Sequence, residues 1–376
     1  MTRRATTRGH ARRPFDGEAV GVLVCGASFA GLAVARELAG AGAVVLVLDR
    51  YQIGERATSA CAAPTPWLEA MGVTRAIRSE LPCMGFGTPH GSSRYELPWS
   101  WSAFDYSELC EELWEQCGDA RFECAKVERR TPEGVMTDRG EVRAPLVVDA
   151  LGWRRVLAAD GYQPPDAPLS RGLEVHPHAR GGDSLDVWVD RSLVREGYAW
   201  RVPAGAEQRV GVGSYEPRDH VKEPTRALAE RLDVEAERWQ GNWFPHRLRA
   251  ASDGATFFVG DSAGHCLPLS GEGIRTAFYF GIACGRELAS VHAGACTREE
   301  ALSSYGEFSA AHARAFRLLL RCQRALPRVP PRVLSLVFRA LSHPAVVERA
   351  FDWYLEQAHP RMASTAVEPV RLPTAA

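Results

Sequence analysis

The sequence predicts an α/β fold, in which segments from both ends of the chain build a Rossmann-like domain around an interleaved β-rich domain, with helices at the C-terminus. Three observations lead to this prediction. An apolar strand, a glycine loop, a helix and a second strand follow one another at residues 19–49. Short strands and turns alternate through the middle of the chain. A second strand, glycine-rich loop and helix begin near residue 255.

The composition is that of a globular protein and argues against two classes of site. Hydrophobic residues make up 45% and charged residues 24% of the 376 residues. The net charge of -1 argues against a nucleic-acid partner. None of the ten cysteines forms a C-x-x-C pair, so zinc spacing is absent and we expect no metal site. Reduced thiols and a cytoplasmic location are expected.

The first 16 residues are expected to form a disordered basic tail. The segment "RRATTRGHARRPF" resembles a twin-arginine export signal, but the apolar run after it is already explained by the first strand and helix. No window holds the about 18 consecutive apolar residues that a membrane span requires. We therefore expect no spanning helix.

The stretch "VLVCGASFAGLAVARELAGAGAVVLVLDR" predicts a phosphate-binding loop. Gly26 permits a sharp turn out of the strand, and Gly31 lets the helix pack against it. Ser28 stands where the pattern G-x-G-x-x-G has its middle glycine. Asp49 ends the second strand, where a carboxylate accepts hydrogen bonds from the ribose hydroxyls of adenosine. The motif predicts a dinucleotide site in spite of Ser28.

The remaining elements are predicted from periodicity and turn residues. We expect helices at 65–79, 104–117, 225–232, 274–292 and 298–324, with two shorter helices after that, a hairpin at 86–97, and strands within 121–148 and 166–215.

A second motif, "FFVGDSAGHCLPLSGEGIRTAFYFG", is the most specific part of the sequence. A strand runs into Asp261, and Pro268, Gly271 and Gly273 precede a long helix that opens at Ile274. It resembles the second FAD motif of the glutathione-reductase-like flavoproteins, in the branch of aromatic hydroxylases, flavin halogenases, lycopene cyclases and geranylgeranyl reductases. The resemblance implies that FAD is the cofactor and that Asp261 binds a ribityl hydroxyl. It also implies that the helix amides face the N1–C2 edge of the flavin, where a positive helix end stabilises negative charge.

This resemblance suggests how the chain is divided. The FAD-binding domain is expected at 17–83, 105–160 and 251–296, a substrate-domain hairpin at 84–104, the rest of the substrate domain at 161–250, and a helical region with a tail at 297–376.

A third segment, "LVVDALGWRRVLA", falls where hydroxylases carry D-A-D-G-x-x-S-x-x-R. Asp149 matches, whereas Leu151, Arg155 and Ala158 replace the second aspartate, the serine and the final arginine. Because the hydroxylase motif serves FAD and reduced nicotinamide together, the electron donor stays open between NAD(P)H and another reductant.

The segment "GYAWRVP" indicates the branch. Tyr198, Trp200 and Pro203 match the Y-x-W-x-F-P of geranylgeranyl reductases, and the resemblance implies that they bind substrate. Halogenases also need a lysine near the flavin, and the chain has none before Lys126. In a strand, Tyr198, Trp200 and Val202 share one face. That face is either the wall of an apolar substrate channel or part of the core.

Cys61 and two arginines are further candidates. Reductases of this family place a cysteine near the flavin after the second strand, which makes Cys61 a candidate proton donor. The alternatives are a pairing with another cysteine and a small buried side chain. Arg50 and Arg56 are candidates for binding the FAD phosphates. For Arg56, a substrate anion and a solvated surface position are the alternatives.

The arginine-rich C-terminal helices have two interpretations. They dock on an anionic membrane that holds a lipid substrate, or they cover the core of the protein itself.

We therefore expect an FAD-dependent oxidoreductase that resembles geranylgeranyl reductases and reduces a carbon–carbon double bond of an apolar, isoprenoid or polyene-like substrate. Three alternatives stay open. They are a flavin monooxygenase, a flavoenzyme without net redox change that is similar to lycopene cyclases, and a non-catalytic electron relay or lipid-binding module. The expected partners are the apolar substrate, an electron-donor protein and a membrane surface.

Overall fold

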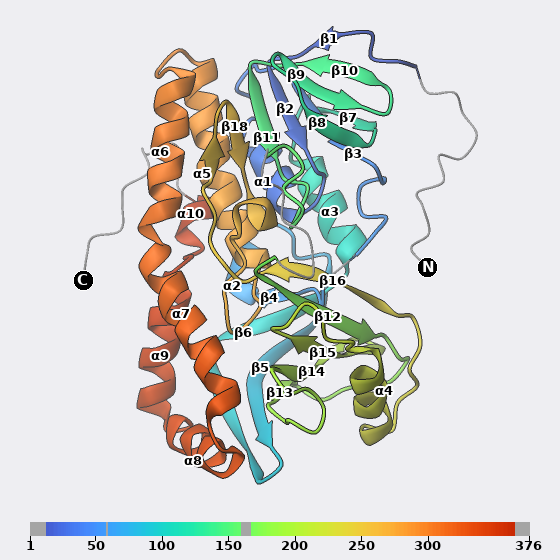
Figure 1. Cartoon of the computed structure of the whole chain (residues 1–376), viewed down its shortest axis with the longest axis vertical. Helices are drawn as coiled ribbons and strands as arrows, with labels where there is room; N and C mark the ends of the chain where they lie inside the picture. Colours follow the sequence, from blue (N-terminus) through green and yellow to red (C-terminus); the bar gives the residue numbers. More distant parts are fainter. Residues whose placement is uncertain (1–12, 58, 159–166, 365–376) are drawn as a thin grey trace.

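The computed structural model of the protein describes residues 13–57, 59–158 and 167–364. Most of the predicted tail at 1–16 and the predicted domain boundary at 160/161 lie outside the described residues, as does the last part of the C-terminal region. The α/β prediction is confirmed, with two large sheets and a layer of helices (Figure 1).

A mostly parallel sheet, built from strands of both ends of the chain, forms one half of the molecule. Its strand order is β17-β18-β11-β2-β3-β7. The strands are β2 (Val22–Cys25), β3 (Val45–Asp49), β7 (Arg121–Cys124), β11 (Leu146–Asp149), β17 (Ser252–Asp253) and β18 (Thr256–Phe258). The central strands β2 and β11 are completely buried, as expected of apolar strands covered on both faces.

Two parallel helices of this half pack against each other at very short range. They are α1 (Phe29–Glu37) and α5 (Ile274–His292). A Cβ built at Gly281 would lie 2.8 Å from the Cβ of Ala33, and one at Gly285 would lie 2.6 Å from the Cβ of Glu37. Because both contacts advance in the same direction along the two helices, their N-termini open on the same side of the domain.

Smaller elements complete this half. Helix α3 (Tyr106–Glu115) begins at the side-chain cap Asp105 and packs against α1. A four-stranded sheet of order β1-β10-β9-β8 lies at the top of Figure 1 and contains β1 (Glu18–Ala19), β8 (Val127–Arg130), β9 (Gly134–Thr137) and β10 (Gly140–Arg143).

An eight-stranded sheet forms the second half, with the order β16-β12-β15-β14-β13-β5-β6-β4. Its strands are β4 (Ala62–Pro64), β5 (Ile77–Thr88), β6 (Gly91–Phe104), β12 (Leu169–Val175), β13 (Ser184–Trp188), β14 (Gly197–Ala204), β15 (Glu207–Ser214) and β16 (Gln240–Pro245). Helix α4 (Lys222–Arg231) buries one face through Leu228, which clusters with Ala199 and Val212. We call the opposite face, which carries Trp200, the inner face.

The C-terminal helices run along one side of both sheets (Figure 1). They are α6 (Arg298–Ala311), α7 (Ala313–Ala325), the short η2 (Leu326–Arg328), α8 (Pro331–Leu341), α9 (Pro344–Glu356) and α10 (Arg361–Ser364). Helix α8 contacts the hairpin of β5 and β6, and α9 contacts β6. Among the described residues, no helix is both long and apolar enough to cross a bilayer.

One predicted helix is wrong in its second half. The sequence predicts a helix over 65–79, but α2 (Thr65–Ala70) is short and β5 begins at Ile77. Gly72 adopts φ +68°, the amide of Val73 donates to the carbonyl of Leu68, and that of Gly72 to the carbonyl of Glu69. These are the bonds of a glycine helix stop. The predicted hairpin is confirmed, with Phe86 opposite Ser93.

The predicted helix over 298–324 is interrupted at His312, which ends α6 and precedes α7. The His312 ring is buried against Tyr279 and Phe280 of α5, and its Nδ1 lies 3.0 Å from the carbonyl oxygen of Phe308. Packing between helices therefore sets the break, which no glycine or proline marks. The predicted division into domain segments stays a prediction.

Candidate functional site

The candidate site lies at the carboxyl edge of the parallel sheet. Strands β2, β3, β11 and β18 are parallel neighbours and all end at this edge. Asp49 is the last residue of β3, and the loops after the other three strands contain the first glycine motif, the segment after Asp149 and the second glycine motif. Open α/β sheets bind ligands at this edge.

The first glycine loop is built as its sequence predicts. Gly26 has φ +115°, and a Cβ there would lie 2.2 Å from the carbonyl oxygen of Ala150 in the neighbouring loop. A Cβ at Gly31 would lie 1.9 Å from the carbonyl oxygen of Gly26. A side chain at either position would clash with this backbone. Glycine therefore allows the loop, the helix and the sheet to approach one another closely. Ser28 caps α1 without a side-chain hydrogen bond to the helix, and its Oγ accepts from Tyr106 Oη at 3.1 Å.

Asp49 ties the end of β3 to this loop. Its Oδ2 accepts from the amide of Ala27 at 2.9 Å, and its Oδ1 accepts from the amide of Tyr51 at 3.0 Å. Burial raises the pKa of the Asp49 carboxyl, and these two hydrogen bonds oppose the rise. Each carboxylate oxygen has a further lone pair, so the group can accept from ribose hydroxyls as well.

The two predicted phosphate arginines stack on one aromatic ring. The guanidinium carbons of Arg50 and Arg56 lie 4.9 Å and 5.2 Å from the ring centroid of Tyr51, and Arg56 also bonds to the Tyr51 hydroxyl. Both arginines are exposed beside the end of β3. They lie near Asp49, but among the described residues the glycine loop makes no hydrogen bond to either side chain.

The second glycine motif forms a short turn, η1 (Gly260–Ala263), followed by the loop to α5. The carboxylate of Asp261 receives no hydrogen bond from any described residue. Burial raises the pKa of this group to about 6. Its Oδ1 is 3.8 Å from where a Cβ would stand on Gly273. The carboxylate therefore lies beside the N-terminus of α5, with its acceptor capacity unused.

The N-terminus of α5 is open. Gly273 caps the helix without a side-chain hydrogen bond, and in the described part of the chain the amides of Gly273 and Ile274 have no acceptor. Such amides carry the positive end of the helix dipole and are ready to bind a negatively polarised group. Pro268 is buried in the preceding loop, where its carbonyl oxygen accepts from the amide of Ser270 at 2.9 Å.

The segment after β11 is held by buried polar contacts. Asp149 accepts from Ser262 Oγ at 2.7 Å and from the amide of Leu157 at 2.8 Å. Arg155 is buried, donates to the carbonyl oxygens of Ala250 and Ser262, and stacks on the Phe258 ring at 3.6 Å. Arg155, which stands in the serine position of the hydroxylase motif, thus joins three loops of this edge together.

The inner face of the eight-stranded sheet is fastened to the second motif. Tyr198 and Tyr215 donate their hydroxyls to the carbonyl oxygens of Ser270 and Leu269, at 2.5 Å and 2.8 Å. Gly271 has φ +67°, and a Cβ there would lie 2.8 Å from Tyr198 Oη. The aromatic strand β14 therefore faces the loop that leads into α5.

Trp200 lies flat on the inner face and is partly exposed. A Cβ on Gly211 would lie 2.3 Å from its Cζ2, so the sheet has a recess that receives the indole. Its Nε1 donates to Oε2 of the buried Glu174 at 3.0 Å. Val202 clusters with it, whereas Pro203 points to the other face, where it approaches Gly181. The structure thus brings Tyr198 and Trp200 together but not Pro203.

Cys61 lies buried at the edge of the inner face. Arg209, which extends from that face, donates to the carbonyl oxygen of Cys61 at 2.9 Å, and Cys61 Sγ donates to that of Ser59 at 3.1 Å. Burial raises the pKa of the thiol to about 12. The thiol therefore stays protonated at neutral pH, in keeping with either a proton donor or a small buried side chain.

A buried ion pair at the start of α5 was not predicted from the sequence. Arg275 is completely buried, and its Nε lies 2.5 Å from Oε1 of Glu272. It also donates to the carbonyl oxygens of Tyr354, Leu355 and Ala358, which joins the end of α9 to the second motif. The "GEGIR" letters show both charges, but nothing local shows that α9 covers them.

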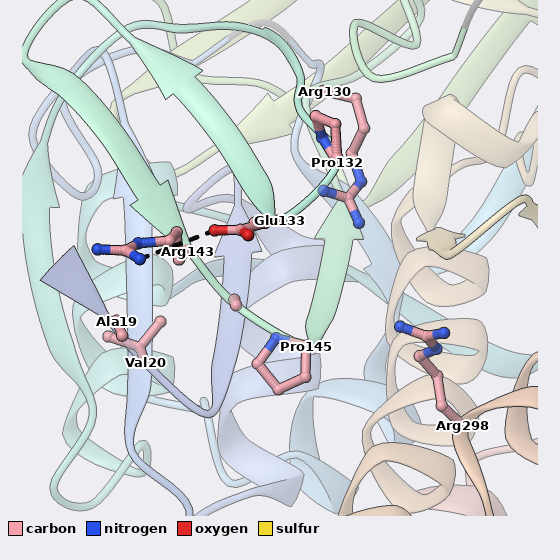
Figure 2. A pocket seen from close by; sticks show the side chains of 9 residues that line it. Ala19, Val20, Arg130, Pro132, Glu133, Arg143, Pro145 and Arg298 are labelled. Atoms are coloured by element: carbon pink, nitrogen blue, oxygen red, sulfur yellow. Dashed lines mark ion pairs between the residues drawn. The ribbon is translucent and has the colours of Figure 1, made fainter. Parts of the chain in front are cut away.

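A pocket of about 250 Å³ lies away from this edge. It is lined by Arg130, Arg143 and Arg298, and by Glu133, which pairs with Arg143 (Figure 2). None of the predicted site residues lines it. The described residues include no cluster of three or more side chains able to hold a metal ion.

Comparison with solved structures identifies the fold, whereas no family model and no curated protein sequence matches the chain. A geranylgeranyl bacteriochlorophyll reductase-like protein from Thermoplasma acidophilum matches with a TM-score of 0.79 at 15% identity, over 92% of this chain and 98% of that one. The chain therefore has the fold of this reductase-like protein. PqsL of Pseudomonas aeruginosa, a probable FAD-dependent monooxygenase, matches at 0.63 and 19% identity, over 89% and 100% of the two chains. The halogenase PltM matches at 0.66 and 15% identity, over 94% and 87%.

Proposed function

We propose that the protein is an FAD-dependent oxidoreductase that reduces a carbon–carbon double bond of an apolar, isoprenoid or polyene-like substrate. The observation that carries the proposal is the pairing, at one sheet edge, of two glycine loops with unused hydrogen-bonding groups. Within residues 13–57, 59–158 and 167–364, Asp261 offers an acceptor without a donor, and Gly273 and Ile274 offer donors without an acceptor. The residues present therefore fit a ligand with hydroxyls at one place and a negatively polarised ring edge beside it.

Each part of FAD has a candidate partner. The amides at the start of α1, after Gly26 and Ser28, would bind the pyrophosphate, and Asp49 the adenosine ribose. Asp261 would accept from a ribityl hydroxyl, and the α5 amides would face the flavin N1–C2 edge. The bound flavin supplies hydride transfer to or from carbon.

The inner face supplies the apolar substrate surface. Tyr198 contacts the second motif, and its ring lies 5.8 Å from that of Trp200. The apolar side chains of Val187, Phe86 and Met84 continue the same face across β13 and β5. A long apolar chain can lie along this row with one double bond near α5. Packed aromatic side chains around it would exclude water.

Reduction of a double bond requires a proton as well as a hydride, and Cys61 is the proposed proton donor. Its thiol is buried and protonated, and Arg209 holds its backbone at the edge of the inner face. The electron donor is proposed to be NAD(P)H or another reductant. Arg155 holds neighbouring loops together where the hydroxylase motif serves nicotinamide, which favours a donor other than directly bound NADPH.

A monooxygenase is the second candidate, because the fold is shared with PqsL as well as with the reductase-like protein. Halogenation is disfavoured, since the only lysines of the chain are Lys126, directly before β8, and Lys222, at the start of α4.

Anaerobic turnover tests the proposal. The purified protein is reduced with dithionite in the absence of oxygen and mixed with geranylgeranyl diphosphate or a carotenoid. The molecular masses of the products are then determined by mass spectrometry. A reductase adds two hydrogen atoms per double bond. A product that appears only after oxygen is admitted, and that carries an added oxygen atom, indicates a monooxygenase. An isomeric product of unchanged mass indicates a cyclase. A flavin that cycles while both probes stay unchanged indicates an electron relay or a different substrate class.

A further inference from the structure

The outer surface of the C-terminal helices concentrates the exposed apolar side chains of the molecule. Seven of the eight large apolar side chains that are exposed in the described residues lie between Leu318 and Trp353, and the eighth is Val44. Leu336 is 63% exposed, more than any other of these side chains. We call these seven side chains of 318–353 the apolar patch. Such a concentration on one layer marks an interaction surface.

Helix α8 is apolar on two sides. Leu334 and Phe338 face inward, where Leu334 is buried and the Phe338 ring lies 5.1 Å from that of Phe86. Val333, Leu336 and Val337 share the outer side at helical spacing and are 41–63% exposed. Arg332, Ser335 and Arg339 form the remaining polar side, so the apolar side of α8 is broad and only part of it faces the protein. In the part of the chain that the structure describes, only the inner side is covered.

The same layer is strongly basic. On α7 and the turn after it, Arg314, Arg317, Arg321, Arg324 and Arg328 recur every three or four residues and are exposed. This spacing aligns them in one stripe, which we call the arginine stripe.

The stripe is part of a local excess of positive charge. Residues 313–353 contain eight arginines, no lysine and two acidic residues, a net charge of plus six in a chain whose total is -1. None of these eight arginines forms an ion pair with a described residue, whereas arginines elsewhere, such as Arg94 and Arg201, do. The free charges are therefore available to an anionic partner.

We propose that the apolar patch and the arginine stripe bind the surface of an anionic lipid bilayer, with α8 lying in the interface. An interfacial helix buries an apolar side among acyl chains, and nearby arginines bind anionic headgroups. A second copy of the chain is a poorer occupant, because it would bring two layers of equal positive charge together. Lipid binding of this kind does not require the flavin chemistry proposed above.

The position of α8 and α9 gives the surface a further use. Phe338 of α8 contacts Phe86, and Phe351 of α9 packs with the apolar cluster that includes Trp200 and Val202. The inner sides of these helices therefore border the row of side chains proposed to hold the substrate. A lipid that leaves the bilayer would meet this border first.

Vesicle sedimentation tests the proposal with the full-length protein. The vesicles contain phosphatidylcholine alone or phosphatidylcholine mixed with phosphatidylglycerol, at low and at high salt. The variants are Leu336→Ser with Val337→Ser, and Arg317→Ala with Arg321→Ala. Val44→Ser and Arg129→Ala are the matched controls, since Val44, directly before β3, and Arg129 of β8 are both exposed outside the C-terminal helices.

The wild type is expected to sediment with the anionic vesicles and much less with phosphatidylcholine alone. The apolar double variant should bind at least about tenfold more weakly, because two aliphatic side chains no longer leave water. Each arginine removed should cost about fivefold at low salt and less at high salt. Both controls should bind as the wild type does. Melting temperatures close to wild type would show that the exposed substitutions leave the fold intact.

Two results would overturn the proposal. One is an absence of sedimentation with anionic vesicles, and the other is unchanged sedimentation of the apolar double variant. Light scattering in the absence of lipid tests the alternative occupant, a second copy of the chain. A wild type that is dimeric together with an apolar double variant that is monomeric would assign the surface to a second copy instead. Should that variant melt early, Val333→Ser alone replaces it, because Val333 is 47% exposed and lies on the same side of α8.

Discussion

Replacing Arg275 by methionine is expected to destabilise the protein far more than replacing a typical surface arginine. The Arg275 side chain is 0% exposed, and that of its partner Glu272 is 4% exposed. The substitution keeps an unbranched side chain of similar length but leaves the Glu272 carboxylate buried without its cation. Glu272 would retain only the hydrogen bond from Tyr354 Oη at 2.5 Å.

The magnitude follows from burial. Removing one partner of a buried ion pair costs about 3–5 kcal/mol, because the other charge stays desolvated. Three carbonyl oxygens at the end of α9 also lose their donors. For a chain of this length we expect the melting temperature to fall by roughly 5–10 °C.

Differential scanning fluorimetry measures this effect, and limited proteolysis shows where it acts. Because Arg275 joins α9 to α5, cleavage in α9 should increase first. Arg298→Met is the matched control, since Arg298 pairs with Glu299 on the surface, where both side chains are at least 40% exposed. Its melting temperature should change by less than about 1 °C.

The pair has a second test. Glu272→Gln combined with Arg275→Met removes both charges and should recover part of the lost stability. A single Arg275→Met variant as stable as the Arg298→Met control would refute the claim that α9 is anchored to the second glycine motif through this ion pair.

Three further predictions concern the site. The pKa of about 6 at Asp261 lies above the ordinary value of an aspartate. Below pH 6 the free protein therefore carries a proton on this group, and the proton must leave before the carboxylate can accept a hydrogen bond from FAD. FAD affinity, measured by fluorescence titration, should therefore fall by up to about tenfold per unit as the pH drops from 6 to 4, and Asp261→Asn should flatten that profile. Trp200→Ala should cost about 3 kcal/mol in thermal denaturation because the indole fills the recess over Gly211, and a melting temperature equal to that of wild type would rule out this packing. At pH 8, iodoacetamide should label the exposed Cys322 while Cys61 stays unmodified in peptide mass maps, since its pKa is about 12; rapid labelling of Cys61 would contradict its burial.

The sequence predicts the carboxyl edge of the parallel sheet well because its determinants are local. A glycine at φ +115° and a glycine under a neighbouring carbonyl are required by the turn itself, so Gly26 and Gly31 stand in the sequence where the fold needs them. The same holds for Gly271 before α5, which has φ +67° and lies directly beneath Tyr198 Oη. Residues far apart in the sequence then meet because the strands that carry them are neighbours in the sheet.

Other features depend on contacts that no local pattern encodes. Ile77 joins a strand because β6 pairs with it, and the helical periodicity of 65–79 does not show this. Pro203 matches a family motif by spacing, but strand alternation turns it away from Trp200. The ion pair between Glu272 and Arg275 becomes buried only when α9 arrives about 80 residues later in the chain. The local sequence cannot show such cover, although a glutamate and an arginine three residues apart at the start of an otherwise apolar helix are a signal to look for it.

The identity of the bound cofactor tests the central claim most directly. The purified protein, or the apoprotein incubated with FAD and freed of excess, is heated, and the released molecule is identified by chromatography against FAD, FMN and NAD. We predict a yellow protein that releases about one FAD per chain, with occupancy reduced in Asp261→Ala and nearly lost when Gly31→Ala drives a methyl group against Gly26. Release of FMN or NAD alone, or a protein that stays colourless after incubation with FAD, would contradict it.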